Sequence, residues 1–489
     1  MKNKIDKLIV QSALFGVALL CSVMAFAEEP ALPSGLEDLS SEPDLPMGLE
    51  SDEPSLPSGP DLDDAEPDLP TGLGDAVDEG FDETEQTDQG FVLEGFAELR
   101  SGLWVDRHRY QERRPLNEAR LQLELEKEFS VFTFAATADL IYDDVADDRD
   151  IELESGQGWL DLRAANMVFS PVSFMDVRLG RQTLTWGTGD LIFINDLFPK
   201  DWNAFLIGRD VEYLKAPSDA VKVSLFHDLA NLDLIYTPRF DADRYIDGSR
   251  ASYFGSTLGR IVGTDAVAKV NRPNDWFHDD ELALRLYRNI GAYELALYGY
   301  DGFWKSPGGF DPLTGRALFP DLTVYGASIR GPLAGGIANA EWGYYGSRDD
   351  RNGHDPMINN SEQRLIVGYE RELATNLTLG LQYYLKRMED YSDYRRVLPA
   401  GSFPAHRSRQ EYTARLTWLT MNQNLIWSLF TFYSPSDDDG YLRAKLQYKY
   451  DDHLSLELGG NLFWGDNEHT FLGQFQNNDN VYTAVRYGF

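Results

Sequence analysis

Cysteine is nearly absent from this chain of 489 residues, in which Cys21 is the only one. It lies in an apolar stretch that follows a lysine-rich start and ends in Ala25-Phe26-Ala27. This arrangement is typical of a secretory signal peptide and predicts cleavage after Ala27, which leaves a secreted chain without cysteine. Disulfides, a cysteine zinc site and a cysteine nucleophile are thereby excluded.

Basic residues are also scarce, with 44 Lys and Arg against 80 Asp and Glu and a net charge of −36. Such a chain is not expected to bind nucleic acid. Beyond the signal peptide there is no apolar run long enough for a membrane-spanning helix. No nucleophile elbow, zincin or phosphate-loop motif is present, and the seven histidines are scattered. We therefore predict neither an enzyme nor a cofactor or metal site.

Residues 28–90 contain 21 acidic residues and no Lys or Arg, so we expect a disordered acidic tail, placed in the periplasm by the organisation inferred below. The tail carries four copies of Glu-Pro-x-Leu-Pro-x-Gly, which start at Glu29, Glu42, Glu53 and Glu66. Proline-flanked leucines are typical of short peptide ligands. The predicted partner-binding positions are Leu32, Pro33, Leu45, Pro46, Leu56, Pro57, Leu69 and Pro70. A solubilising spacer without a partner is the alternative.

Apolar and polar residues alternate throughout 91–489, as in the stretch from Arg120 to Glu126. Short turns alternate with long connections, which include 105–116, 143–157, 239–280, 302–321, 388–408 and 465–479. This asymmetry predicts an all-β fold, a transmembrane antiparallel β-barrel of about 18 strands, with 16 as the alternative. The strands are expected to begin near 91, 117, 131, 158 and 174, within 209–227, and near 231, 281, 291, 322, 337, 363, 376, 409, 424, 441, 453 and 480. The expected organisation is a signal peptide at 1–27, the tail at 28–90 and the barrel at 91–489.

The last predicted strand places Tyr487 and Phe489 on one face. A final phenylalanine on such a strand resembles the insertion signal of bacterial outer-membrane barrels. The resemblance implies recognition by the barrel-assembly machinery, contact with outer-membrane lipid and residence in the bacterial outer membrane.

If the apolar face meets lipid, the polar face lines the lumen, which then carries acids and bases in nearly equal number. The pore-lining candidates are Arg178, Arg181, Gln182, Arg415, Arg443, Lys445, Arg486, Glu94, Glu98 and Glu124. Acids dominate the first two strands and bases the last ones, and closure brings these walls together. Cross-strand ion pairs that seal the barrel are favoured over a transverse field that orients solutes.

The segment 191–207 is too apolar for a solvated loop and is predicted to fold into the lumen as a constriction or short plug. Its candidate residues are Phe193, Asp196, Phe198, Asp201 and Trp202. Just before it, the run Leu179-Gly-Arg-Gln-Thr-Leu-Thr-Trp-Gly187 resembles a motif of alginate-export-type porins and related outer-membrane barrels. The resemblance covers roughly residues 177–215. It implies that Arg181 and Gln182 lie beside an inward-folded loop and shape the pore.

These patterns predict an outer-membrane channel. Because a general porin gains nothing from the repeats, we expect a component of a trans-envelope transport or export system whose tail recruits a periplasmic carrier or inner-membrane transporter. A general or substrate-selective diffusion porin is the alternative, and a non-conducting structural barrel or scaffold is a second one.

Overall fold

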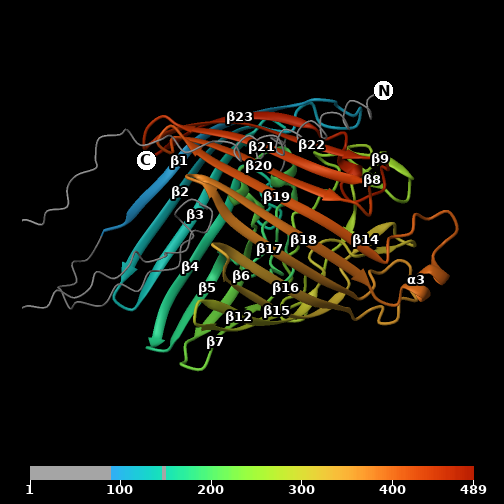
Figure 1. Cartoon of the computed structure of the whole chain (residues 1–489), viewed down its shortest axis with the longest axis horizontal. Helices are drawn as coiled ribbons and strands as arrows, with labels where there is room; N and C mark the ends of the chain where they lie inside the picture. Colours follow the sequence, from blue (N-terminus) through green and yellow to red (C-terminus); the bar gives the residue numbers. More distant parts are fainter. Residues whose placement is uncertain (1–89, 146–149) are drawn as a thin grey trace, which may run out of the picture. The chain divides into compact units, whose positions relative to one another are not determined.

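The computed structural model describes residues 90–145 and 150–489, and the alternating sequence forms strands there (Figure 1). Eighteen of them form one sheet, which confirms the predicted number. They are β1 (Val92–Trp104), β2 (Asn117–Phe129), β3 (Phe132–Asp143), β4 (Leu160–Val172), β5 (Met175–Thr183), β6 (Pro217–Leu225), β7 (Asn231–Thr237), β11 (Glu281–Ile290), β12 (Tyr293–Phe303), β15 (Asp321–Leu333), β16 (Gly336–Ser347), β17 (Glu362–Ala374), β18 (Leu377–Met388), β19 (Ser408–Thr420), β20 (Leu425–Ser434), β21 (Asp439–Lys449), β22 (Leu454–Gly465) and β23 (Asn480–Gly488).

Each of these strands pairs antiparallel with its neighbours in the sequence, and β1 pairs with β23, so that the sheet closes. In the closing pair Glu98 lies opposite Arg486, which brings the acidic first wall beside the basic last wall. A closed sheet has no unpaired edge, and this is the condition for a sheet to exist in lipid.

The connections at the two ends of the barrel differ in length. The turns at one end are short, and the longest of them is 226–230. The other end carries the long connections, such as 184–216, 238–280 and 389–407. These hold the short helices α2 (Trp202–Ile207), η1 (Val211–Leu214), α3 (Tyr391–Val397) and η2 (Gly473–Phe475), and the small strands β8 (Tyr253–Gly255), β9 (Arg260–Val262), β10 (Val270–Asn271), β13 (Gly309–Asp311) and β14 (Arg316–Leu318). Within the described residues, no helix is long and apolar enough to cross a membrane.

The barrel is apolar outside and polar inside, the reverse of a water-soluble protein. Leu99, Leu297 and Leu458 are exposed on the outer wall, whereas Glu98, Arg100 and Asp139 are buried within. An apolar outer band around a charged interior is the pattern of an outer-membrane barrel. The chain is therefore a β-barrel of the bacterial outer membrane, with the long connections on the extracellular side.

Candidate functional site: the inward segment and the lumen

The connection between β5 and β6, residues 184–216, folds into the lumen and crosses it. We call it the inward segment. Its first part contacts β16, β18 and β19 through residues 188–195. Its second part contacts β22, β23, β1, β2 and β4 through residues 206–215. The segment is thus attached to opposite walls before it returns to β6.

A single carboxylate on β16, Glu341, holds the first part of the inward segment. The backbone N–H groups of Thr188, Gly189 and Asn195 donate to it, the last two at 3.0 and 3.3 Å. The Asn195 side-chain amide donates a fourth bond at 3.1 Å. Gly187, the end of the recognised motif, has a φ of +91°, and a Cβ there would lie 3.0 Å from Glu341 Oε1. The motif therefore ends in a turn shaped around this carboxylate.

Two glycines of the wall make room for the same part of the segment. Gly326 of β15 and Gly343 of β16 lie opposite each other in register. A Cβ at Gly326 would lie 1.7 Å from the Asn195 Oδ1 atom, and one at Gly343 would lie 2.7 Å from the Ile194 side chain. The inward segment thus seats in a recess that only these glycines leave open.

We expect Gly326→Ala to displace Asn195 and weaken the docking of the inward segment, at a cost of about 1–3 kcal/mol, because overpacking forces the neighbours to shift. Single-channel recording should show a noisier current. Gly299→Ala is the matched control, since no atom lies within 4 Å of its Cβ position. Equal, quiet currents from both variants would contradict the seating.

Apolar packing holds the middle of the segment. Phe198 is buried with Ile194, Leu184 and Trp304 in one cluster. Phe193 and Trp202 pack at the edge of a second cluster, built around Phe430 and Tyr441 of the opposite wall. The predicted inward fold of 191–207 is therefore what the structure shows, and its apolar residues bridge the two sides of the lumen.

The predicted acids of the segment serve its internal structure. Asp196 accepts a bond from Thr185 Oγ1 at 2.9 Å and pairs with Lys200 Nζ at 2.9 Å. Asp201 caps α2 by accepting the N–H of Ala204 at 2.7 Å. It also lies 3.3 Å from Arg244 Nη1 of the 238–280 loop, and Arg244 reaches Asp161 of β4 at 2.8 Å. Arg244 thus joins a second extracellular loop to the inward segment and to the wall.

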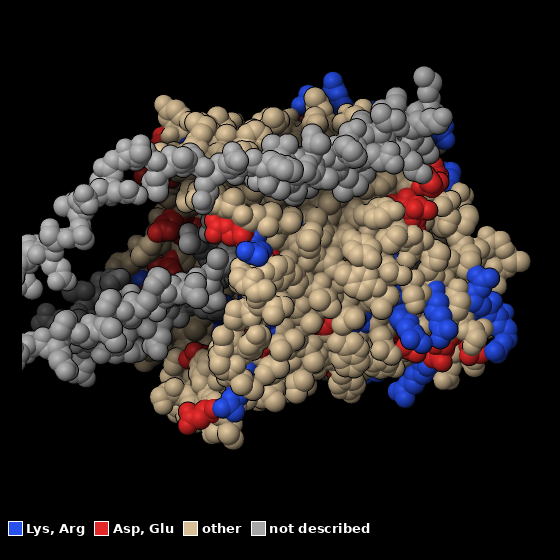
Figure 2. Space-filling view, in the orientation of Figure 1, with Lys and Arg blue, Asp and Glu red and all other residues tan. Residues whose placement is uncertain are grey.

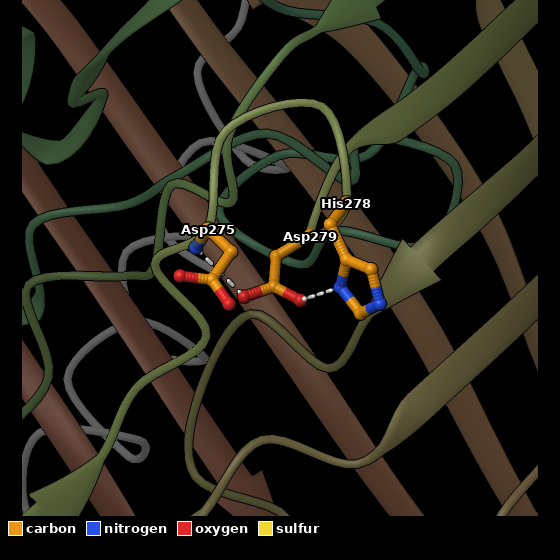
Figure 3. A group of neighbouring side chains, drawn as sticks. All are labelled: Asp275, His278 and Asp279. Atoms are coloured by element: carbon orange, nitrogen blue, oxygen red, sulfur yellow. Dashed lines mark hydrogen bonds and ion pairs between the residues drawn. The ribbon is translucent and has the colours of Figure 1, made fainter.

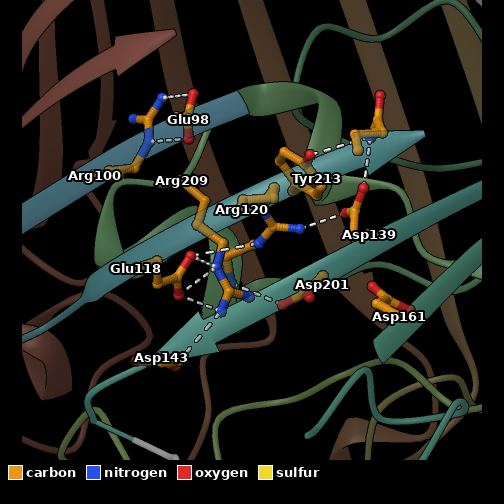
Figure 4. A network of polar contacts seen from close by, with 12 residues as sticks. Glu98, Arg100, Glu118, Arg120, Asp139, Asp143, Asp161, Asp201, Arg209 and Tyr213 are labelled. Carbon is orange, nitrogen blue, oxygen red and sulfur yellow. Dashed lines mark hydrogen bonds and ion pairs between the residues drawn. The ribbon is translucent and has the colours of Figure 1, made fainter. Parts of the chain in front are cut away.

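Beyond α2, charged groups attach the inward segment to the first strands (Figure 4). Arg209 binds Glu118 of β2 at 2.5 Å, and Arg100 of β1 donates to the Gly208 carbonyl at 2.8 Å. Gln122 donates to the Tyr213 hydroxyl at 3.2 Å. These groups are nearly inaccessible to water, which strengthens each contact and makes the loss of a partner costly.

Lumen-facing bases of the last strands face the acids of the η1 region. Burial alone would raise the pKa of Asp210, but Lys445 and Arg486 hold that pKa well below its usual range. Burial raises the pKa of Glu212, which nevertheless lies 2.8 Å from Arg486 Nη2. Only about 10 Å³ of space remains among Arg100, Asp210 and their neighbours, no more than one water needs.

The seam is sealed by ion pairs, as the sequence favoured. Arg486 binds Glu98 at 2.9 Å, and Arg100 binds Glu98 at 2.9 Å and Glu457 at 2.7 Å.

Three further basic pore-lining candidates hold the inward segment. Arg443 donates to the Arg209 carbonyl at 2.7 Å, Lys445 lies 3.7 Å from Asp210, and Arg415 binds Asp190 at 2.5 Å.

The opposite part of the lumen leaves charged side chains accessible to water. Arg178 is exposed, and Lys222 and Glu294 are about one-third exposed. Lys222 lies 4.0 Å from Asp233, and Arg285 lies 2.7 Å from Glu294. These side chains lie in the halves of β5–β7, β11 and β12 next to the short turns, whereas nearer the other end the same strands pack against the inward segment through Ala220, Ile235, Ala283 and Tyr300.

Arg181 and Gln182 lie on opposite faces of β5, as successive strand residues do. Gln182 is buried on the lumen face and donates to the Ala220 carbonyl at 3.1 Å. Arg181 binds the Leu162 carbonyl at 2.6 Å and half-exposed Asp219 at 3.2 Å, outside the lumen. The motif thus sends one side chain to each side of the wall.

The remaining candidates lie near the periplasmic end or outside the described residues. Glu94 and Glu124 lie opposite each other on β1 and β2, the first exposed and the second half-buried. Phe489 exchanges backbone hydrogen bonds with Gly95, and its side chain is exposed beside that of Tyr487. The signal peptide and the repeat positions from Leu32 to Pro70 lie outside the described residues.

Sequence reasoning missed the residues that hold the inward segment in place. The alternation of strand residues places Glu341 on the lumen face together with many other acids. No sequence pattern around Gly326, Gly343 or Arg244 marks them as contacts of the segment. Their partners lie far away in the sequence, as in the 146 positions that separate Asn195 from Glu341.

Asp275, His278 and Asp279 form a group in the 238–280 loop with ligand atoms within 4.8 Å of one another (Figure 3). Asp279 accepts the N–H groups of Asn274 and Asp275 at 2.7 and 2.9 Å, and its other oxygen lies 2.9 Å from His278 Nδ1. This hydrogen bond raises the pKa of His278. The hydrogen bonds of this group therefore stabilise the turn at residues 274–279.

A closed barrel with a segment folded into its lumen is the architecture of an outer-membrane porin. No protein-family profile matches the chain, and no curated protein matches it. Pseudomonas aeruginosa OccK3 (OpdO) is similar over 81% of this chain and 95% of its own, with 11% identity and a TM-score of 0.48. P. aeruginosa OccD3 (OpdP) is similar over 82% of this chain and 91% of its own, with 10% identity and a TM-score of 0.47. A mutant of Rh. blastica porin is similar over 82% of this chain and 100% of its own, with 12% identity and a TM-score of 0.39.

Proposed function

We propose that the barrel is a narrow channel for small hydrophilic solutes, which pass beside the inward segment and along the lumen face of β5–β7, β11 and β12. One observation carries the proposal. The segment packs against much of the wall, yet charged lumen side chains such as Arg178, Lys222 and Glu294 stay accessible to water in the halves of β5, β6 and β12 next to the short turns.

The charges along this accessible wall alternate in sign, which favours polar solutes over ions of one sign. Lys222 is followed by Asp233, Arg285 and Glu294 on successive strands, and Glu294 lies opposite Arg330 in register. A solute that carries both donors and acceptors can exchange its water for these groups step by step. A wall of one sign would hold a counter-ion and repel its partner.

Recording from single channels in planar bilayers tests the proposal. The whole chain should conduct in small, uniform steps, and a variant without residues 188–207 should conduct in larger ones. If neither conducts, although both migrate as folded barrels, the chain is a closed structural barrel.

We further propose that the channel serves a trans-envelope transport system through its tail. The support is the sequence alone: four leucine-containing repeats in an acidic segment. A flexible chain as long as residues 28–90 spans about 45 Å. That reach is enough to hold a basic carrier or transporter near the pore.

Replacing Leu32, Leu45, Leu56 and Leu69 by serine is expected to abolish crosslinking of the tail to its periplasmic partner, because the apolar anchors are lost while the charge stays. Conductance of the purified barrel should not change. Serine at Leu39 and Leu62, outside the repeats, is the control. If transport in cells is normal with the fourfold variant, the tail is a spacer and the diffusion porin is the better description.

A further inference from the structure

Four exposed arginines gather at the extracellular end of β18 and in the loop that follows it. Arg387 belongs to β18, Arg395 and Arg396 to the last turn of α3, and Arg407 precedes β19. We call them the α3 patch. Figure 2 shows Lys and Arg gathered over the part of the molecule where Figure 1 places α3.

The loop that carries the α3 patch is pinned by its own hydrogen bonds. Tyr391 donates to the Ala405 carbonyl at 3.2 Å, and the Ala405 N–H donates to the Tyr394 hydroxyl at 3.0 Å. The Met388 N–H donates to the Arg407 carbonyl at 2.8 Å. The arginines are therefore held on a fixed frame, which lowers the entropy that a ligand must overcome.

Three of the four arginines have no partner for their side chains in the part of the chain that the structure describes. Among residues 90–145 and 150–489, those of Arg387, Arg395 and Arg407 make neither a hydrogen bond nor an ion pair. Arg396 pairs with Asp393 at 2.7 Å but is 69% exposed. Elsewhere on the same rim the outward base Arg348 is neutralised by Asp301 at 2.9 Å and Asp321 at 3.4 Å.

The outer wall below the α3 patch shows where the membrane ends. Tyr383, Tyr412 and Tyr433 lie side by side in register across β18, β19 and β20, as an aromatic girdle at a membrane interface does. Arg387 lies two outward positions beyond Tyr383 on the same face of β18. Its neighbours in register are Gln363 and Ser408, so this row is polar on all three strands. Arg387 thus lies at the level of lipid headgroups.

We propose that the α3 patch binds the phosphate groups of lipopolysaccharide, the anionic glycolipid of the bacterial outer leaflet. Arginine suits this ligand because its planar guanidinium binds phosphate with two parallel hydrogen bonds. The patch is a base-rich area on a protein whose charge is otherwise strongly acidic, and it lies beside the lipid rather than in the lumen. A bound glycolipid would anchor one sector of the barrel.

The test is a titration of the full chain in detergent with diphosphoryl lipid A, with fully dephosphorylated lipid A and with inorganic phosphate. The wild type should bind the diphosphoryl form about tenfold or more tightly than the dephosphorylated form, and less tightly as salt rises. The variant with Arg387→Gln, Arg395→Gln and Arg407→Gln should lose this preference. Inorganic phosphate at the same concentration should not compete.

A control variant removes three positive charges at the periplasmic end, by Lys127→Gln, Arg288→Gln and Arg371→Gln. It should keep the preference, because these side chains face the other leaflet. Equal losses in both variants would mean that net charge, not the α3 patch, attracts the lipid. An unchanged preference in the patch variant, or full competition by inorganic phosphate, would also overturn the proposal. Migration of the unheated barrel on a gel verifies that every variant is folded.

Discussion

Glu341→Ala is expected to give a folded barrel with a larger and noisier current than the wild type. The carboxylate accepts hydrogen bonds from three backbone N–H groups of the inward segment and from the Asn195 amide. Bonds to a charged group contribute about 1.5–3 kcal/mol each, and because such bonds are not additive we expect a loss of about 3–6 kcal/mol in docking free energy. Residues 187–195 should then leave the wall and fluctuate across the open side of the lumen.

Single-channel recording separates this effect from a change in lumen charge. Glu294→Ala removes the same charge from a water-accessible position that holds no part of the segment. It should shift the ion selectivity and leave the current quiet. If Glu341→Ala is as quiet as the wild type, the apolar clusters and the other polar contacts hold the segment without Glu341.

Arg244→Ala is expected to loosen the extracellular side of the barrel. Its guanidinium lies 2.8 Å from Asp161 and 3.3 Å from Asp201, and all three side chains are almost fully buried. Removing the base leaves two buried carboxylates uncompensated, at a cost of about 3–5 kcal/mol. The 238–280 loop and the helix α2 would lose their common anchor.

Limited proteolysis of the folded protein measures this loosening. Cleavage within 238–280 should accelerate about 100-fold or more, because local opening follows the lost free energy. Arg351→Ala, at an exposed arginine in the connection between β16 and β17, should leave the rate near that of the wild type. Adding Asp161→Asn to Arg244→Ala should restore part of the protection, since it removes one stranded charge. Equal cleavage in Arg244→Ala and the wild type would contradict the anchoring.

The alternation of the sequence predicted the strands well because lipid allows few alternatives. The lipid-facing side of the second strand carries Leu121, Leu123 and Leu125, and the other side turns Arg120 and Glu124 toward water. A shift of the strand register by one residue would exchange the two faces and is therefore excluded. The sixth strand was placed only within 209–227, and the structure begins it at Pro217. A proline is acceptable at the first position of a strand, where no ladder hydrogen bond needs its missing N–H.

The inward fold of 191–207 could be predicted from composition, since eleven apolar residues in a loop of this length need cover from water. The way it is held could not. Glu341, Gly326 and Arg244 act on partners that the closed barrel brings near, and the relation between such positions is set by strand tilt and stagger rather than by local pattern. The alternation pattern correctly places Arg415, Arg443 and Lys445 on the lumen face. The inward segment nevertheless lies against these three residues and is held by their positive charges.

By itself, the sequence determined the all-β class, the number of strands, the face that most strand residues take and the apolar character of the inward segment. These depend on period-2 alternation and on solvent, both of which act locally along the chain. The tertiary structure alone decided which wall the segment covers, which charges are used to hold it, and which remain open to a solute. That choice follows from pairwise contacts between residues far apart in the sequence, because a buried charge is tolerated only where closure of the barrel supplies its partner.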